Sequence, residues 1–326
     1  MEKINYSKGI LDGFEYLLTN HEEVFVLGQG LWSPWYVGAS MTDLDKKYGK
    51  SRIIDSPVSE LATTGAGVGA AILGKRPIIV HPRIDFMLLA VDQIVTQAAK
   101  WRNMFGGKSS APITIRGMVN RGGEQGAQHS QSLHSWFAHI PGLKVVMPSS
   151  ANDARDLLIA SVLSDDPVLY IDDRWLYDCS EELKEIDKTP LSLQKPKVVR
   201  LGNDITLVSC SYTTKLCLDA ALELEKSGIS VEVIDLRVIN PLDYDSIINS
   251  VNKTGRICSV DGCWQNCGLA GEILAGVTER IDLRLLKTNP KRITLPDSPA
   301  PTSKVLEDLY YINSSNIVNY IKSIFL

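Results

Sequence analysis

Short apolar runs alternate with amphipathic stretches along most of the chain. Residues 4–20 place apolar side chains at helical spacing, and the apolar run 23–28 follows them. The further strands expected in the first half of the chain are 52–54, 76–80, 111–116, 143–147 and 167–171, and the further helices are 55–71, 85–105 and 151–163. Alternation of this kind predicts a parallel sheet that is covered by helices on both faces.

A charged stretch with two prolines, residues 173–197, interrupts this pattern. The alternation then restarts, with strands expected at 204–209, 230–235, 256–261 and 292–295 and helices at 213–227, 240–252, 268–280, 303–311 and 315–325. We therefore predict an α/β protein of two doubly wound domains, a larger one at 1–185 and a smaller one at 195–326. The length of 326 residues suits two domains of ordinary size.

Composition narrows the classes of function. Hydrophobic residues make up 44% and charged residues 22% of the chain, so it can build proper cores. The net charge of −4, without a basic run, predicts no nucleic-acid partner. The apolar runs are too short for a membrane span, and the first residues lack a signal-peptide pattern. Six scattered cysteines indicate reduced thiols and a cytoplasmic location, because no further ligand completes a zinc site around Cys263 and Cys267.

The stretch 55–71, DSPVSELATTGAGVGAA, places an acid at the start of a helix. Asp55 and Ser56 are candidate caps, Pro57 suits an early position, and Glu60 falls in the first turn. The rest of the stretch is small and apolar, so we expect this helix to be buried. A buried carboxylate needs a partner or a proton. Two interpretations stay open: Glu60 contacts a ligand, or it is a first-turn acid that the helix dipole stabilises.

Three positions in this helix match the spacing of the dinucleotide-binding motif GxGxxG/A, namely Gly65, Gly67 and Ala70. That motif requires a strand directly before it and a helix that starts at the glycines. The residues before Gly65 are already helical in our interpretation. We therefore expect the glycines to permit close helix packing and not to bind a nucleotide.

Two further candidate stretches follow expected strands, the turn 81–86 and the glycine-rich loop that ends at His129. Ligands of an open parallel sheet bind at the carboxyl ends of its strands. A carboxylate such as Glu60, an aromatic ring and an imidazole at this edge would suit proton transfer on a flat heterocycle. The alternative is structural: Phe86 as a core side chain and His129 as a buried, hydrogen-bonded histidine. We expect His134 to be a surface or packing residue.

Five stretches carry a resemblance to a known family. They are DSPVSELATTGAGVGAAILGKRPI, AVDQIVTQAAK, GAQHSQSLHSWFAHIPGLKVVMPSSANDA, VIDLRVINPLD and LPDSPAPTSKVLEDLYY. In this order and over almost the whole chain, the sequence resembles the beta subunit of the two-chain, thiamine-diphosphate-dependent decarboxylase component of 2-oxo acid dehydrogenases. That component belongs to the transketolase superfamily. The resemblance implies a pyrimidine-binding domain followed by a transketolase C-terminal-like domain.

The resemblance also implies roles for single residues. Glu60 matches the glutamate that hydrogen-bonds the pyrimidine nitrogen of thiamine diphosphate, and Phe86 matches the aromatic ring that stacks on the pyrimidine. Val58 matches an apolar contact of the same ring, and His129 matches a histidine that handles protons during acyl transfer. A structural K⁺ in some members is bound by backbone carbonyls that match those of Ile113, Ser161, Ser164 and Asp166.

The family's Gly-Asp-Gly…Asn motif, which binds Mg²⁺ and the diphosphate, is missing from this sequence. In the family the alpha subunit carries it. The resemblance therefore implies half of an active site, an α₂β₂ heterotetramer with Mg²⁺ ligands on the alpha subunit, and a lipoyl acyltransferase core as a further partner. The implied reaction decarboxylates a 2-oxo acid and transfers the acyl group to lipoamide.

Three departures from the family pattern leave the substrate open. They are His81-Pro82-Arg83, the charged segment 121–125 and Asn240. If His81 and Arg83 face the pocket, a more polar or anionic substrate is expected; if they point to solvent, nothing follows. The alternatives are a split transketolase or an acyloin-forming ligase and, from another class, a non-catalytic scaffold or regulatory subunit.

Overall fold

The computed structural model describes residues 2–325, and the chain divides into two compact units. The first unit contains the residues up to Arg121 together with Phe137–Gln194. The second contains the residues from Lys195 onward together with the short excursion Gly122–Trp136. The two units are joined near the end of the charged stretch, whereas the excursion is absent from the sequence-based expectation.

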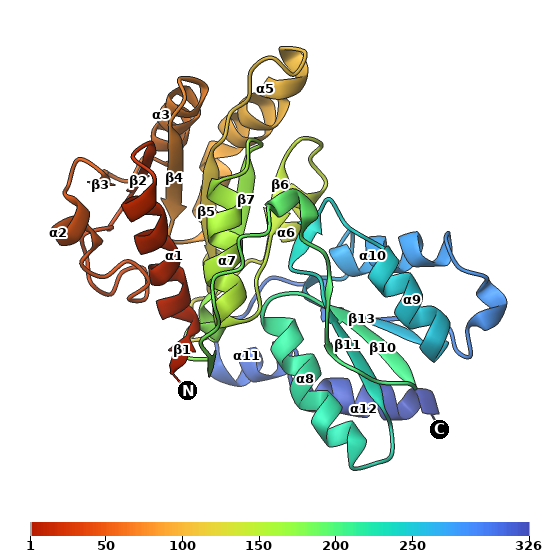
Figure 1. Cartoon of the computed structure of the whole chain (residues 1–326). Coiled ribbons are helices and arrows are strands. Elements are labelled where there is room, and N and C mark those ends of the chain that lie inside the picture. Colours follow the sequence, from red (N-terminus) through yellow and green to blue (C-terminus); the bar gives the residue numbers. More distant parts are fainter. Residues whose placement is uncertain (1, 326) are drawn as a thin grey trace. The chain divides into compact units, whose positions relative to one another are not determined.

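The first unit is built on a parallel sheet (Figure 1). Its strands lie in the order β6 (Lys144–Val146), β7 (Val168–Asp173), β5 (Thr114–Val119), β4 (Arg76–His81), β2 (Val24–Gly28) and β3 (Ile53–Asp55). Every neighbouring pair among them is parallel, as the alternating pattern predicts. A separate antiparallel pair joins β1 (Lys3–Asn5) to β8 (Ser180–Glu182).

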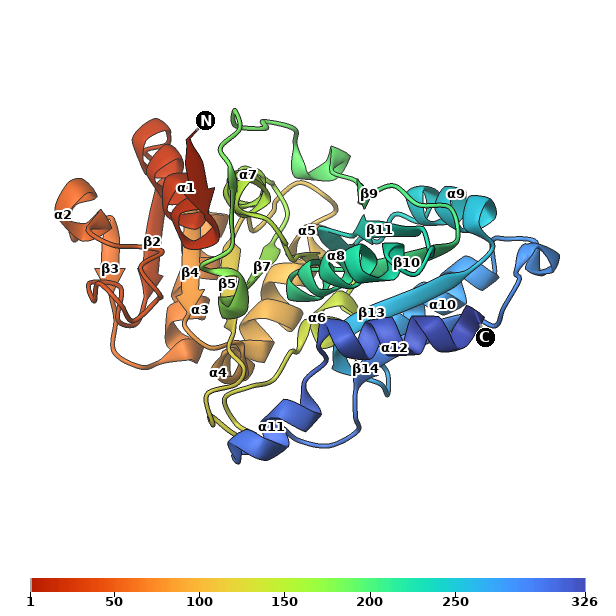
Figure 2. The ribbon, with the colours of Figure 1, turned by 90° about the horizontal axis from the view of Figure 1, so that it is seen from below.

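Helices cover both faces of this sheet (Figure 2). On one face α1 (Tyr6–Asn20) packs against α7 (Ala151–Val162) so closely that a Cβ on Gly9 would lie 2.2 Å from the carbonyl oxygen of Ala151. On the other face lie α3 (Glu60–Ile72) and α4 (Ile84–Met87). The short helices are α2 (Leu44–Tyr48), α6 (His134–Ala138), η3 (Arg174–Leu176) and η4 (Leu191–Leu193).

Helix α3 begins later than the sequence suggests. Its N-cap is Ser59, so Glu60 is the first helical residue, and the expected cap Asp55 instead accepts a hydrogen bond from the N–H of Leu31 at 3.2 Å. The glycines lie inside the helix, which confirms that they do not form a nucleotide-binding turn. A Cβ on Gly67 would lie 2.6 Å from Cδ1 of Ile79. Glycine is thus required there for close packing on β4.

The long helix expected over 85–105 is a continuous helical run over residues 84–104, but its winding is not α throughout. The chain forms α4, then the 3₁₀ turn η1 (Leu88–Ala90), the π-helical segment η2 (Asp92–Ala98) and finally α5 (Ala99–Met104). Both η1 and η2 pack against α3. Apolar spacing predicts a helical winding in general, but packing against a neighbour decides whether it is α, 3₁₀ or π.

The second unit repeats the architecture with a smaller sheet. Its strands lie in the order β14 (Lys291–Leu295), β13 (Ile257–Trp264), β10 (Ile205–Ser209), β11 (Val231–Asp235) and β9 (Lys197–Arg200). The pairs are parallel except for β9, which runs antiparallel along β11. The helix expected within 240–252 is α9 (Asp245–Thr254), which begins later than residue 240. The short strand β12 (Val238–Asn240) precedes it, and Pro241 disfavours a helical conformation of the residue before it.

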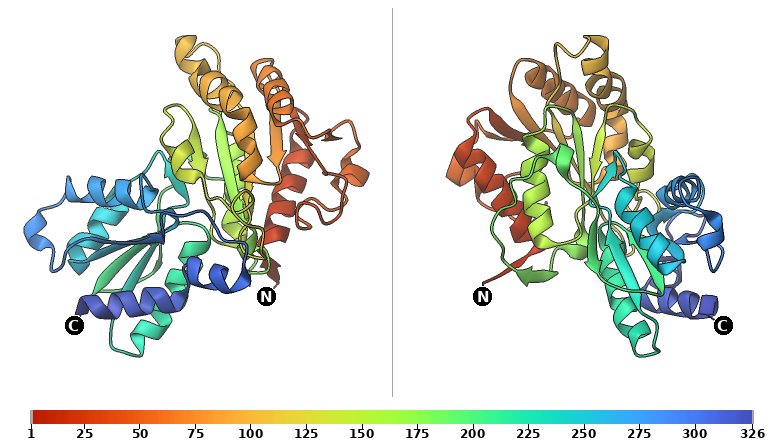
Figure 3. Two further views of the ribbon diagram at one scale, coloured as in Figure 1. Left: turned by 180° about the vertical axis from the view of Figure 1, so that it is seen from behind. Right: turned by 45° about the vertical axis from the view of Figure 1, so that its right-hand side comes forward.

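Helices cover this second sheet on both faces (Figures 1 and 3). Helices α8 (Tyr212–Glu225) and α12 (Ser314–Phe325) pack on one face, and α9 and α10 (Leu269–Thr278) on the other. The first of these layers has a fully apolar core that includes Leu207, Ala220, Val233, Val260 and Ile317. The remaining elements are η5 (Leu283–Leu285) and α11 (Lys304–Tyr310).

Two observations bear on the compositional expectations. No helix within residues 2–325 is both long and apolar enough to cross a membrane. All six cysteines lie in that range, and each is a free thiol.

Candidate functional site

Glu60 lies where the chain turns from the carboxyl end of β3 into α3. Its side chain is nearly buried, with 8% of its surface exposed. Within residues 2–325 no hydrogen bond or ion pair holds its carboxylate, although burial of a charge ordinarily demands one. The N-terminus of α3 favours the negative charge through its dipole. This acid is therefore available to a ligand and is not neutralised by a lysine or arginine of the described chain.

Apolar side chains around Glu60 are unusually exposed. Val58 is 73% exposed, Leu61 56% and Leu89 61%, and α3, which carries Leu61, packs against η1, which carries Leu89. Phe86, on α4, is 37% exposed and so is not the fully buried core residue of the structural alternative. Exposed apolar groups that gather near a nearly buried acid indicate a surface that another molecule covers.

His81 ends β4 and lies beneath α3. It is buried, and its Nε2 lies 3.1 Å from Oγ1 of Thr64 on α3. Burial lowers the pKa of His81 from its ordinary 6.5 to about 4. The imidazole is therefore neutral at pH 7 and brings no positive charge to an anionic substrate.

Arg83 follows two residues later, at the N-cap of α4. Partial burial and then the neighbouring charge of Arg174 lower the pKa of Arg83. Arg174 follows the carboxyl end of β7 and donates a hydrogen bond from Nη2 to the carbonyl of Tyr36 at 2.5 Å. The carboxylate of Asp85 acts in the opposite direction and raises the pKa of Arg83. Two guanidinium groups and one carboxylate thus lie at the carboxyl ends of strands in this sheet.

His129 belongs to the second unit, whereas Glu60, His81, Arg83 and Phe86 lie on neighbouring elements of the first unit. The imidazole is partly exposed, and the backbone N–H of His129 donates to the carbonyl of Gly126 at 3.4 Å. His129 is thus not the fully buried histidine of the structural alternative.

The carbonyls expected to hold a monovalent cation lie just before β5, in the last turn of α7 and in the turn that leads to β7. Three of the four already accept a hydrogen bond: that of Ile113 from the N–H of Val168, that of Ser161 from the N–H of Ser164, and that of Ser164 from Nη1 of Arg76 at 2.8 Å. A monovalent cation would share these oxygens with the chain's own donors. The cation site stays a prediction.

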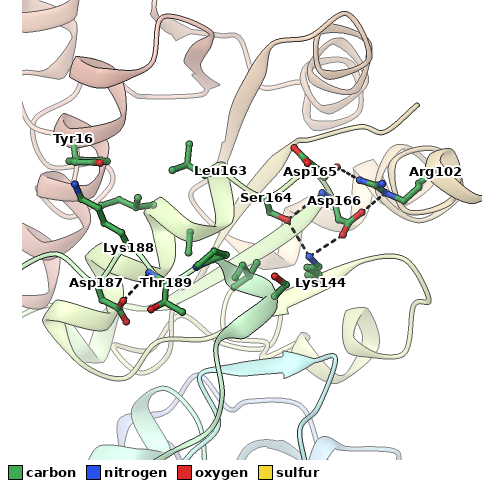
Figure 4. A pocket seen from close by; sticks show the side chains of 15 residues that line it. Tyr16, Arg102, Lys144, Leu163, Ser164, Asp165, Asp166, Asp187, Lys188 and Thr189 are labelled. Atoms are coloured by element: carbon green, nitrogen blue, oxygen red, sulfur yellow. Dashed lines mark hydrogen bonds and ion pairs between the residues drawn. The ribbon is translucent and has the colours of Figure 1, made fainter. Parts of the chain in front are cut away.

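The same turn attracts two further cationic side chains (Figure 4). Lys144 Nζ lies 3.0 Å from Oδ2 of Asp166, and Arg102 Nε lies 2.6 Å from Oδ1. Burial alone would raise the pKa of Asp166, but Lys144 and Arg102 lower it below its ordinary value. The turn is therefore neutralised by side chains of the protein itself.

A pocket of about 510 Å³ opens beside this turn (Figure 4). It is lined by the end of α7, by the residues just before β7, and by the segment that leads to η4. Because Lys144 and Asp166 precede strands whose carboxyl ends point the other way, the pocket lies at the edge of the sheet opposite to Glu60. The pocket is thus not lined by the predicted catalytic residues Glu60 and His129.

Several buried ion pairs are not predicted from the pattern of the sequence. Arg116 on β5 forms a bidentate ion pair with Asp172 on β7, at 2.9 and 3.0 Å, and Arg121 pairs with Asp173 at 2.6 Å. The strands β5 and β7 are neighbours in the sheet, so side chains on the same face of the two strands lie close together. A charged residue inside an otherwise apolar strand is the signal that could have found them. Within residues 2–325 no group of three or more His, Cys, Asp or Glu side chains could hold a metal ion.

Comparison with known sequences decides the family. The family described as transketolase, pyrimidine binding domain matches residues 2–178, and transketolase, C-terminal domain matches residues 194–317. The chain is 37% identical over 330 residues to the acetoin:2,6-dichlorophenolindophenol oxidoreductase subunit beta of Cupriavidus necator, covering 97% of this chain and 95% of that one. The chain belongs to this transketolase-like family of beta subunits.

Other members and a solved structure agree. The mitochondrial pyruvate dehydrogenase E1 component subunit beta of Dictyostelium discoideum is 40% identical over 312 residues, covering 94% of this chain and 87% of that one. A split-gene transketolase, described as an inactive β4 tetramer, superimposes with a TM-score of 0.76 at 18% identity, covering 98% and 96% of the two chains. That structure confirms the fold, and the family membership implies thiamine diphosphate as cofactor.

Proposed function

We propose that this chain is the beta subunit of a thiamine-diphosphate-dependent enzyme that acts on a 2-oxo acid or on acetoin. The observation that supports it is the carboxylate of Glu60, nearly buried at the start of α3 and without a partner in the described chain. Such a group fits a cofactor that offers a ring nitrogen as a hydrogen-bond partner. When bound, thiamine diphosphate supplies the electron sink for breaking a bond beside a carbonyl group.

The chain's own residues would bind and orient. Glu60 would hold a hydrogen bond to the pyrimidine ring, Phe86 would stack on that ring, and Val58 would add an apolar contact. His129 would hold or release a proton near the reacting carbonyl. Apart from Glu60, whose carboxylate would bind the pyrimidine ring, these side chains carry no oxygen ligand for Mg²⁺. We therefore place the Mg²⁺ ligands on an alpha subunit in an α₂β₂ assembly.

Coverage by a partner is supported by the exposed apolar side chains of Val58, Leu61 and Leu89. An alpha subunit that packs on them would remove water from the site and bring the diphosphate-binding half of the pocket. A lipoyl acyltransferase core, lipoamide as acceptor and a cytoplasmic location stay predictions. An occupied K⁺ site is not part of this proposal, because three of the four expected carbonyls already accept hydrogen bonds from the chain.

The substrate has two candidates, a 2-oxo acid and acetoin. At the carboxyl edge of the sheet lies a region with two guanidinium groups, those of Arg83 and Arg174, and one carboxylate, that of Asp85. Pyruvate and other 2-oxo acids carry a carboxylate that this region would attract. Acetoin is uncharged, and beta subunits that act on it are among the similar proteins. We favour a 2-oxo acid on the ground of this charge.

The test is co-expression with an alpha subunit encoded in the same genome. The assembly is assayed with pyruvate, longer 2-oxo acids and acetoin, with 2,6-dichlorophenolindophenol as electron acceptor and with or without thiamine diphosphate. We expect turnover only with both chains and cofactor. Full activity of the beta chain alone would contradict the proposal, as would an assembly that is inactive on every one of these substrates.

A further inference from the structure

The segment that carries His129, Gly122–Trp136, has an unusual backbone. Gly122, Gly123, Glu124 and Gly126 all have φ between +60° and +71°. Glycine tolerates this left-handed conformation, but a residue with a Cβ such as glutamate disfavours it. The turn at Glu124 therefore needs support from elsewhere in the second unit.

That support on the N-terminal side of His129 is Glu307 of α11. Both of its carboxylate oxygens accept the backbone N–H of Glu124, at 3.0 and 3.1 Å, and Glu307 is only 3% exposed. A Cβ on Gly126 would lie 2.6 Å from Oγ1 of Thr302, so the turn also fits tightly against the residues before α11. A buried carboxylate that binds a backbone N–H directly makes a strong contact.

The support on the C-terminal side is His134, which is buried, so that of the two expected roles, surface or packing residue, the first is wrong. Nδ1 of His134 lies 3.0 Å from Oγ of Ser132, and its Nε2 lies 2.9 Å from Oδ1 of Asp261 on β13. His134 and Asp261 are each 1% exposed. Burial alone would raise the pKa of Asp261, but His134 and two backbone N–H donors lower it.

Asp261 is itself fixed in place. Its Oδ1 accepts the N–H of Cys263 at 3.1 Å, and its Oδ2 accepts the N–H of Ala270, in the first turn of α10, at 3.2 Å. The adjacent N–H of Leu269 donates to Oγ of Ser135 at 2.9 Å. The segment is thus attached at its C-terminal end to the start of α10 and to the middle of the second sheet.

We propose that Asp261 and Glu307 are positioning residues, which hold the segment of His129 from both sides and so set the place of its imidazole for the reaction. This inference rests on the proposed function, because it assumes that His129 acts on the substrate. Neither acid contacts substrate or cofactor; each acts through the backbone or through His134. The histidine is then presented by a rigid segment, although it lies on a loop.

Misplacing a catalytic group by about 1 Å lowers a rate by roughly a hundredfold. Loosening either end should therefore lower kcat of the assembled enzyme by about tenfold to a hundredfold and leave KM within about twofold. In Asp261→Asn the amide NH₂ must face one backbone N–H donor, that of Cys263 or that of Ala270, so a hydrogen bond is lost with little change of volume. In Glu307→Ala both acceptors of the Glu124 N–H disappear.

The first measurement is independent of activity. Hydrogen–deuterium exchange of the assembled enzyme should become faster in peptides from Gly122–Trp136 in Asp261→Asn and Glu307→Ala, and should stay unchanged in peptides from α3. The matched control is Asp308→Asn, the next residue of α11, which is exposed and forms an ion pair with Lys304 in the same helix. Unchanged exchange of the segment in both variants would overturn the proposal.

The second measurement is a double-mutant cycle with His129→Ala. If Asp261 acts through His129, adding Asp261→Asn to His129→Ala lowers kcat by less than about twofold further. Full multiplication of the two separate losses would overturn the positioning role. Wild-type activity of His129→Ala would instead refute the role of His129 in the proposed function. The two failures are therefore distinguishable.

Discussion

The two edges of the first sheet differ in what their charged side chains bind. At the carboxyl edge Glu60 has no partner within the described residues, and Val58, Leu61 and Leu89 are exposed beside it. At the amino edge Asp166 is held by both Lys144 and Arg102. Both edges belong to the same parallel strands, so the difference does not come from the sheet.

The difference identifies which edge depends on another molecule. A turn whose charges are neutralised by its own chain needs no ligand to be stable. A nearly buried carboxylate without a partner is unfavourable until something meets it, and exposed apolar groups are unfavourable until something covers them. The pocket beside Asp166 lies at the amino edge, where the charges are already paired. A search for cavities alone would therefore point away from Glu60.

The largest effect that sharpens this comparison is expected from Glu60→Gln. Glutamine keeps the size of the side chain but removes the charge, so kcat of the assembled enzyme should fall by about 10²- to 10⁴-fold. The melting temperature should not fall, because no internal partner is lost. Glu22→Gln, at an exposed position, is the control. Near-normal turnover of Glu60→Gln would show that the active site does not depend on the acid at the carboxyl edge.

The next effect is on stability and comes from His81. Its pKa is about 4 in the folded chain, against an ordinary value of 6.5 that applies to the unfolded chain. Between these values the unfolded chain binds the proton that the folded chain rejects, so stability is complete above pH 6.5 and falls by about 1.4 kcal/mol per pH unit toward pH 4. Urea unfolding at several pH values measures this slope. The slope should flatten in His81→Gln, and an identical slope would show that His81 is not its source.

A smaller effect is expected from Arg83→Ala. If the guanidinium group of Arg83 attracts the substrate's carboxylate, KM for pyruvate should rise about tenfold. This rise corresponds to the loss of one charge-assisted hydrogen bond. KM for acetoin, which has no charge, should not change. Lys75→Ala, at the exposed end of the turn after α3, is the control. Equal changes of KM for both substrates would show that Arg83 does not distinguish a charged from an uncharged substrate.

The smallest effect concerns the amino edge. Replacing KCl by choline chloride at equal ionic strength should shift the melting temperature by less than about 1 °C, because Arg76, Lys144 and Arg102 already neutralise the turn. A K⁺-specific rise of several degrees would show that the carbonyls bind the cation and would end the contrast between the edges. Differential scanning fluorimetry is sufficient for this measurement.

Much of the fold could be predicted because each element carries its own periodicity. The parallel sheets, the two α/β units and the close packing at Gly67 follow from local pattern. The change of winding within residues 85–105 could not, because apolar spacing does not distinguish α, 3₁₀ and π turns. The start of α3 was placed too early, because Asp55 is used by the loop at Leu31.

The candidate site shows the same division. Glu60 stands at a helix start that the sequence marks clearly. The pair of His134 and Asp261 joins positions that are 127 residues apart in the chain. No local rule connects an imidazole at the start of α6 with a carboxylate on a distant strand, so only the folded second unit reveals the pair.

The course of the backbone between the units has a practical consequence. The chain passes from one unit to the other three times, at Arg121/Gly122, Trp136/Phe137 and Gln194/Lys195. A chain truncated near residue 194 would keep Gly122–Trp136 but lose Asp261, Thr302 and Glu307, which hold that segment. Chimeras between relatives should therefore exchange Gly122–Trp136 and the residues from Lys195 onward together, because the two stretches form one unit.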